Sequence, residues 1–185
     1  MRRGRWVIVL VPLLGLWPAP VRAADEDSSG GTPCTFEVEV TMSPGLSDHP
    51  SSGTFDSKGE TGKIDCQGDV GGQRATGPGS FGTEGRYGTG GDGDDCRSKR
   101  GQGDGTAHLT IPVEGGSRHI DDPFDLTYRV DGRSVVGEMT GRRFTATFDV
   151  TQADGDCLWR PVTKIRIKGK GRLRDGDPAD VPVPE

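Results

Sequence analysis

The sequence predicts an all-β domain, an antiparallel meander of about eight strands that forms a closed or nearly closed barrel. Three observations predict it. Apolar and polar side chains alternate along several segments, Gly-rich turns separate these segments, and four cysteines are available for two disulfides. No segment after the N-terminal apolar run shows the spacing of an amphipathic helix. A helix-rich fold is therefore excluded.

The N-terminus has the three-part layout of a secretory signal peptide. Residues 2–5 carry three arginines, residues 6–17 are mostly apolar, and small residues lead to a cleavage site after Ala23. The apolar run is too short to span a bilayer. We therefore expect residues 1–23 to be removed from a secreted, extracellular protein that has no membrane span.

Removal of this segment makes the protein more acidic. The chain has 23 basic and 28 acidic residues, and four of the basic ones lie in residues 1–23, so 19 basic and 28 acidic residues remain and the net charge changes from −5 to −9. Such a surface repels a phosphate backbone, which disfavours nucleic acid as a partner. The sequence also lacks a P-loop, and we expect no cofactor.

Composition divides the remaining chain into three parts. Residues 24–33 and 175–185 are polar or Pro-rich and contain few apolar side chains, so we expect a disordered leader and a disordered tail. Residues 34–174 contain the alternating segments and form a single β domain.

Five segments of this domain place apolar residues at every second position, as on strands with one buried and one solvated face. In order they are 35–42, 108–113, 124–130, 143–150 and 164–168. The Gly-rich stretch between residues 53 and 105 gives weaker signals. There we expect strands at 63–68, 73–76 and 80–88.

The connections between strands show turn chemistry. Tight hairpin turns need residues that accept a positive φ, and Asp-Gly or Gly-Gly pairs supply them. Three such pairs are predicted as turns: Asp104-Gly105, Gly115-Gly116 and Asp131-Gly132.

The last strand indicates how the sheet closes. Its even positions are basic from Lys164 to Arg174, and the first strand offers Glu37 and Glu39 on its outer face. Pairing the first strand with the last would match opposite charges across the ladder and remove both edges of the sheet.

The four cysteines of an exported chain predict two disulfides. The nearest two are thirty residues apart in the sequence, which does not suit a zinc site. Closure of the sheet favours pairing Cys34 with Cys157 and Cys66 with Cys96. The two other pairings stay open.

The basic row is the most distinctive candidate binding surface. It consists of Lys164, Arg166, Lys168, Lys170, Arg172 and Arg174. Six cations on one strand face would attract a polyanion in a salt-dependent way. The interpretation we favour is a charge-paired, solvated face that discourages edge-to-edge aggregation.

Metal binding and catalysis have weaker signals. Asp92, Asp94 and Asp95 match the start of a calcium-binding nonapeptide repeat, but the run occurs once and lacks the apolar residue that should follow. They are therefore weak calcium candidates, and we expect no metal. The three histidines lie in no metal or catalytic motif, so the sequence favours a protein without catalysis, although a set assembled in space stays open.

The barrel interior is the last candidate site. If Ile165 and Ile167 point inward, so do Gly169 and Gly171, and the missing side chains leave room for aromatic rings or for a pocket. The candidate wall or filling residues are Phe124, Tyr128, Phe144, Phe148 and Trp159. We expect a filled interior, with a cavity for one small ligand as the alternative.

Several short motifs carry a resemblance to known proteins. They are Cys66-Gln67-Gly68, Thr76-Gly77-Pro78-Gly79, Gly103-Asp104-Gly105-Thr106-Ala107, Ile111-Pro112-Val113, and Gly155-Asp156-Cys157 followed by Pro161-Val162-Thr163. In these motifs the chain resembles small exported proteins of high-GC Gram-positive bacteria, which implies export and a β-barrel-like domain without known catalytic residues. Gly85-Arg86-Tyr87-Gly88 is similar to strands of allene-oxide-cyclase-like barrels, and no site residue is transferred from them.

These observations predict a secreted, non-catalytic binding or cell-envelope interaction module, with a cell-wall polymer or an extracellular protein as its partner. One alternative is a ligand-holding or cyclase-type barrel with an internal cavity. The other is an extracellular protease inhibitor, whose loop would be Asp92–Gly105, tethered at Cys96.

Overall fold

A computed structural model describes residues 30–174 except 58–61, 97–99, 132–133, 156 and 158. The predicted signal peptide, most of the predicted leader and the predicted tail lie outside these residues. The described residues form strands and no helix, and so include no helix that is long and apolar enough to cross a membrane.

Alternation of apolar and polar residues translates directly into strands. Along β1, for example, buried and more exposed residues alternate from Thr32 to Met42. The strands within the described residues are β1 (Thr32–Leu46), β2 (Gly53–Asp56), β3 (Gly62–Cys66), β4 (Asp69–Val70), β5 (Gln73–Arg74), β6 (Gly79–Tyr87), β7 (Arg100–Val113), β8 (Gly116–Asp131), β9 (Ser134–Gly141), β10 (Phe144–Ala153) and β11 (Val162–Leu173).

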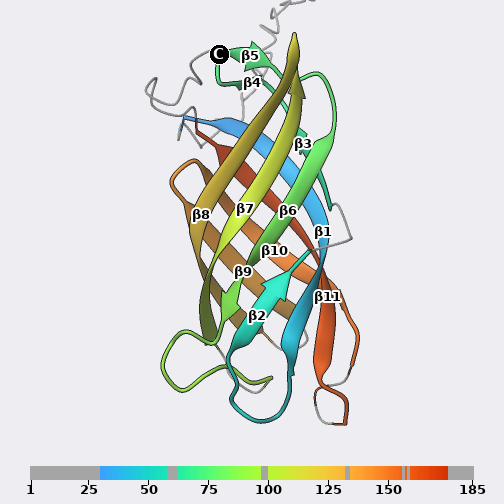
Figure 1. Cartoon of the computed structure of the whole chain (residues 1–185), viewed down its shortest axis with the longest axis vertical. Coiled ribbons are helices and arrows are strands. Elements are labelled where there is room, and N and C mark those ends of the chain that lie inside the picture. The colour runs from blue at the N-terminus through green and yellow to red at the C-terminus, as the bar shows by residue number, and fades with distance from the viewer. Residues whose placement is uncertain are drawn as a thin grey trace, which may run out of the picture.

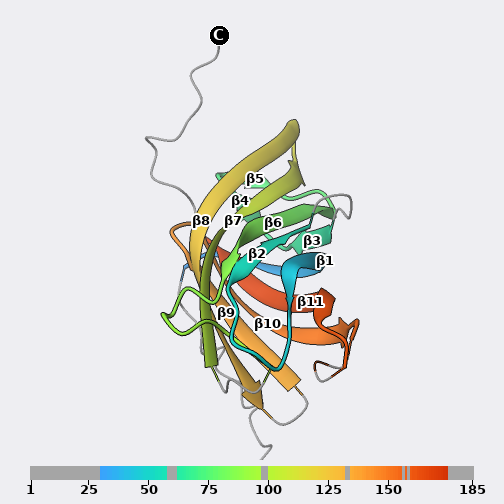
Figure 2. The same ribbon diagram turned by 60° about the horizontal axis from the view of Figure 1, so that its bottom comes forward.

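The main sheet is antiparallel and closes on itself. Its strands follow the order β11-β10-β9-β8-β7-β6-β2-β1, and β1 pairs in turn with β11. The short strands β2 and β3 both bridge β1 and β6, so they share one of eight positions in the ring. Figures 1 and 2 show this arrangement from the side and with the lower end turned forward. The predicted fold class is confirmed.

Two local predictions are wrong. β1 begins at Thr32, inside the predicted leader, because Thr32 is buried, pairs with Leu173 and donates a side-chain hydrogen bond to the Asp69 carbonyl. Asp104-Gly105 is not a turn, because it lies within β7 and faces Arg86 and Gly85 of β6. The predicted inhibitory loop, Asp92–Gly105, is therefore strand from residue 100 onward, and its residues 97–99 lie outside the described part.

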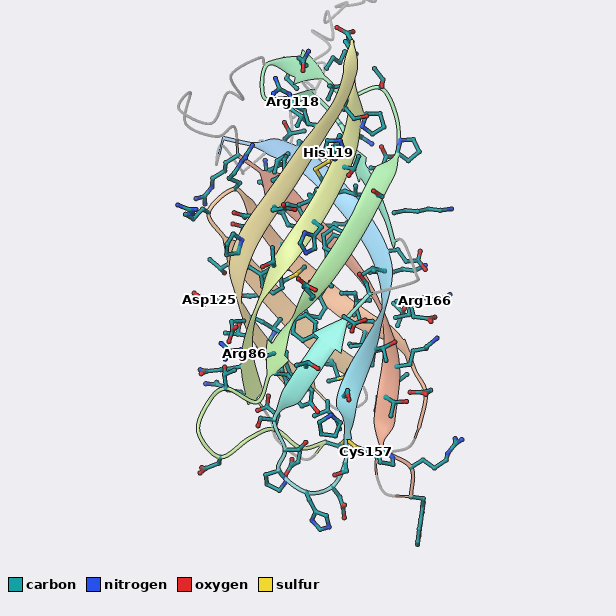
Figure 3. All side chains as sticks on the ribbon, in the orientation of Figure 1. Arg86, Arg118, His119, Asp125, Cys157 and Arg166 are labelled. Atoms are coloured by element: carbon teal, nitrogen blue, oxygen red, sulfur yellow. A yellow bond between two sulfur atoms is a disulfide. The ribbon has the colours of Figure 1, made fainter. Side chains whose placement is uncertain are left out.

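The disulfides join Cys34 to Cys66 and Cys96 to Cys157, so two disulfides are confirmed and the favoured pairing is wrong. The reason is strand direction. Since β1 and β11 are antiparallel, the start of β1 lies beside the end of β11, whereas Cys157 precedes the start of β11. Cys157 therefore lies at the lower end (Figure 3), and Cys34 instead faces Cys66 across the β1–β3 ladder.

The upper half of the ring is filled. Phe36 and Phe81 stack with their ring centroids 4.7 Å apart, and the Phe144 ring lies 5.9 and 6.0 Å from them. We call these three residues the aromatic cluster. Gly169 and Gly171 face inward as predicted, because a Cβ at either position would overlap the Phe36 or the Phe144 ring.

Candidate ligand cavity

The lower half of the ring is hollow. A cavity of about 200 Å³ lies between the aromatic cluster and the loops at the lower end. Its walls are mostly apolar and come from strands all around the ring, among them Met42, Leu126, Met139, Phe148 and Ile167. The expectation of a filled interior therefore holds for the upper half only. A cavity of this size and polarity has room for one small apolar molecule.

Loops at the lower end border the cavity from below. The segment after β6 contributes Asp95 and Cys96 to its lining. Asp94 exchanges two backbone hydrogen bonds with Ser51 of the β1–β2 loop, at 2.8 and 2.9 Å. Cys96 donates its backbone N–H to the Ser47 carbonyl at 3.0 Å and is bonded to Cys157 of the β10–β11 loop. This floor is thus held by backbone pairing and by one disulfide.

A buried carboxylate ties the floor to the wall. Asp94 is 4% exposed, and its Oδ2 accepts hydrogen bonds from the Gly88 N–H at 2.9 Å and from the Tyr128 hydroxyl. Burial, followed by this contact with Asp94, raises the pKa of Tyr128 above its ordinary value. Tyr87 donates its hydroxyl to the Pro44 carbonyl, and burial raises its pKa too. Both phenols therefore stay neutral and act as donors at the floor.

One hydroxyl in the wall has no hydrogen-bond partner among the described residues. Thr83 lines the cavity from β6 and is 4% exposed, yet its Oγ1 makes no hydrogen bond within the described residues. Buried hydroxyls are normally paired, because desolvation without a partner is unfavourable. The cavity is therefore apolar except for Thr83 and the floor.

The structure separates the predicted wall residues. Phe124, Tyr128 and Phe148 line the cavity, whereas Phe144 belongs to the aromatic cluster. Trp159 is not a wall residue: it is 87% exposed, because it lies in the β10–β11 loop outside the ring. The sequence analysis also missed lining residues, including Met139 and Thr83. Met139 lies on β9, whose alternation is interrupted by Gly137, and a lone threonine gives no signal in a sequence rich in threonine.

The basic row lies on the outer face of β11, and Lys164, Arg166 and Lys168 form ion pairs with glutamates of β1. Glu39 contacts Lys164 at 2.6 Å and Arg166 at 3.2 Å, and Glu37 contacts Lys168 at 3.2 Å. Arg166 points away from the ring in Figure 3. The predicted charge match between first and last strand is confirmed.

Glu39 is affected electrostatically by this pairing. The hydrogen bond from Lys164 lowers the pKa of the Glu39 carboxyl below its ordinary value, desolvation opposes the shift, and Arg166 adds to it. Farther along the row, Lys170 faces Thr35 and Thr147, neither of which is acidic. The row is thus partly neutralised in its first half, next to the cavity end, where three cations contact two carboxylates.

The calcium candidates do not converge. Asp92 is exposed, Asp94 uses its carboxylate for Gly88 and Tyr128, and Asp95 lines the cavity. Within the described part of the chain, no group of three or more His, Cys, Asp or Glu residues is placed to hold a metal ion.

The histidines do not share a catalytic arrangement. On the outer face of β7 and β8, His108 Nδ1 lies 2.8 Å from the Asp121 carboxylate, and His119 Nδ1 lies 3.0 Å from the Thr110 hydroxyl. In a Ser-His-Asp triad, the nucleophile and the carboxylate are linked through one imidazole. Here the carboxylate and the hydroxyl contact different histidines, and His49 lies apart in the β1–β2 loop.

Comparison of the chain with protein-family models, with curated proteins and with solved structures finds no match. The fold and the site therefore define the protein only as a closed antiparallel β-ring with an apolar cavity at the end that holds the Cys96–Cys157 disulfide. The resemblance inferred from short motifs stays a prediction.

Proposed function

We propose that this protein is an exported, non-catalytic binding module that holds one small, mostly apolar molecule inside its ring. The observation that carries the proposal is the apolar cavity of about 200 Å³ between the aromatic cluster and the stapled floor. Its apolar walls favour an apolar occupant, because burial of apolar surface away from water is stabilising.

Of the functions expected from the sequence, this one has the most support in the geometry. Binding of a polyanion on the surface would depend on the six aligned cations of the basic row. Three of these cations contact Glu37 or Glu39. A partly neutralised row attracts a polyanion less strongly than an unpaired one. The inhibitor alternative relied on a loop, and much of that segment is either floor or β7.

The binding proposal is tested by calorimetric titration of the oxidised protein with p-xylene, a neutral probe of suitable size. We expect saturable binding of one molecule per chain. Val40 is buried and lines the cavity, so Val40→Phe should abolish binding by filling the space. Thr41→Phe is the matched control, because Thr41 is the next residue on β1 and is exposed. Binding that survives Val40→Phe, or that Thr41→Phe also removes, contradicts the proposal.

Export is supported by the predicted signal peptide and by the disulfides, which persist in oxidising compartments. The test is N-terminal sequencing of the protein recovered from the culture medium of a producing strain. We expect the sequence to begin at Ala24. Protein that stays in the cells with residues 1–23 intact would overturn this part of the proposal.

A further inference from the structure

The position of Thr83 within the ring points to the chemistry of the ligand. The inward positions of β6 alternate as Phe81, Thr83, Gly85 and Tyr87. Phe81 belongs to the aromatic cluster, and Tyr87 reaches the floor. Thr83 therefore lies where the packed half of the ring meets the hollow half, with its side chain on the cavity wall.

Ser57 forms hydrogen bonds with the backbone of Thr83 and not with its hydroxyl. Ser57 donates its N–H to the Thr83 carbonyl at 2.9 Å, and its hydroxyl accepts the Thr83 N–H at 2.9 Å. Both backbone groups of Thr83 are thus satisfied, whereas Oγ1 has no partner within the described residues. Valine has the same shape and would occupy this site without the desolvation cost of a hydroxyl.

A water molecule is a poor substitute partner for this hydroxyl. Buried waters are held by two to four polar groups. Most of the other side chains that line the cavity are apolar, among them Met42, Phe55 and Met139. A bound molecule that carries one polar atom on an apolar frame would hydrogen-bond Oγ1 and fill the apolar cavity at the same time.

The charges around the cavity restrict the ligand further. Asp95 lines the cavity, and no lysine or arginine is found among the described lining residues. Asp94 adds a second carboxylate at the floor, behind Tyr128. A carboxylate ligand would lose its hydration and meet like charge in a region of low dielectric, so it is disfavoured.

Resting on the proposed function, we propose that the cavity takes a neutral, compact molecule about the size of one substituted six-membered ring, bearing a single hydroxyl or carbonyl that hydrogen-bonds Thr83 Oγ1. The size follows from the cavity, since about 150 Å³ of apolar space accepts benzene. The polar atom follows from Thr83. The neutrality follows from Asp94 and Asp95.

The test compares three probes of one shape by calorimetry on the oxidised protein: p-xylene, p-cresol and 4-methylbenzoate. Thr83→Val removes the hydroxyl with little change of shape, and Thr83→Ser keeps it. We expect Thr83→Val to weaken binding of p-cresol about three- to tenfold, and to leave p-xylene unchanged or tighter, because one neutral hydrogen bond is lost. Thr83→Ser should retain the preference for p-cresol, and Thr83→Ala serves as a second hydroxyl-free variant if Thr83→Val does not fold.

The outcomes separate this inference from the proposed function. If the neutral probes bind but Thr83→Val changes p-cresol and p-xylene equally, the hydroxyl does not recognise the ligand and the inference is overturned, while the binding function stands. If 4-methylbenzoate binds more tightly than p-cresol, the neutral ligand class is overturned. If neither neutral probe binds to the unmodified protein, the proposed function itself fails.

Discussion

Phe148 lies directly opposite Gly137 across the β9–β10 ladder, and its ring occupies the space that a Cβ on residue 137 would need. Tyr128 and Gly101 are cross-strand partners with the same relationship. A ring of eight strands has little interior space. An aromatic side chain therefore fits best where the facing residue is a glycine, which has no side chain. These glycines let the rings of the lower half lie against the wall.

Substitution of Gly137 by alanine should therefore destabilise the protein. The added methyl group would collide with the Phe148 ring, and overpacking of this kind costs about 1–3 kcal/mol. Urea unfolding monitored by circular dichroism measures the change. Gly116→Ala is the control, because nothing lies within 4 Å of its Cβ position, and it should change stability little. The double variant Gly137→Ala, Phe148→Leu should recover part of the loss; equal stability of Gly137→Ala and the unmodified protein would contradict the packing.

Thr83→Val should stabilise the ligand-free protein. It removes a buried hydroxyl that has no partner in the described part of the chain, and the expected gain is about 1 kcal/mol in the free energy of unfolding. Thermal unfolding of the two proteins without ligand measures it. A lower melting temperature for Thr83→Val would mean that the hydroxyl is paired in solution.

Tyr128→Phe should weaken the floor of the cavity. Asp94 would keep the Gly88 N–H but lose the Tyr128 donor, and an under-satisfied buried carboxylate costs about 1–3 kcal/mol. The comparison is made by urea unfolding at pH 7.

The raised pKa of Tyr128 predicts how stability changes at alkaline pH. Because the pKa of Tyr128 in the folded protein lies above its ordinary value of 10, the unfolded state releases this proton first and stability falls as the pH rises above 10. Tyr128→Phe should lose stability less steeply in this range. A Tyr128 phenol that ionises near pH 10 in the folded protein, followed by ultraviolet absorbance, would contradict the assignment.

The ion pairs of Glu39 predict that the stability of the fold decreases at acidic pH. The pKa of this carboxyl in the folded protein lies below its ordinary value of 4.5, so its contribution to stability is present above pH 4.5 and is lost as the pH falls through the lowered value. Glu39→Gln should be less stable than the unmodified protein at pH 7, and the difference should vanish in acid. Glu114→Gln, at an exposed turn between β7 and β8, is the control. A difference that persists at pH 2 would assign the effect to packing.

Strands with one buried and one exposed face could be predicted from the sequence. Alternation predicts β1, β7, β8, β10 and β11, because each has one buried face, and the charge match predicts the closure of β1 on β11. β9 was missed because Gly137 stands at an inward position and interrupts the apolar pattern. Asp104-Gly105 was misread as a turn, because glycine also serves packing: a Cβ on residue 105 would crowd the ring of Phe124.

The disulfide pairing and the cavity required three-dimensional information. The adjacency of β1 and β11 follows from their charges, but the antiparallel direction of the two strands places Cys34 and Cys157 at opposite ends of the ring. The cavity exists because the aromatic side chains that fill the strand ring are concentrated in its upper half. Phe144 and Phe148 are four residues apart on one face of β10, yet one fills the upper half and the other lines the hollow half.

The most direct test of the hollow lower half is methyl NMR spectroscopy of the oxidised protein under xenon pressure. Xenon enters apolar cavities without needing a polar contact. We predict progressive, saturable shifts of the methyl resonances of Met42 and Met139, which line the cavity, and no such shift for Val113, which is buried at the end of β7 at the opposite end of the ring. Unchanged Met42 and Met139 resonances, or equal shifts at Val113, would contradict the account.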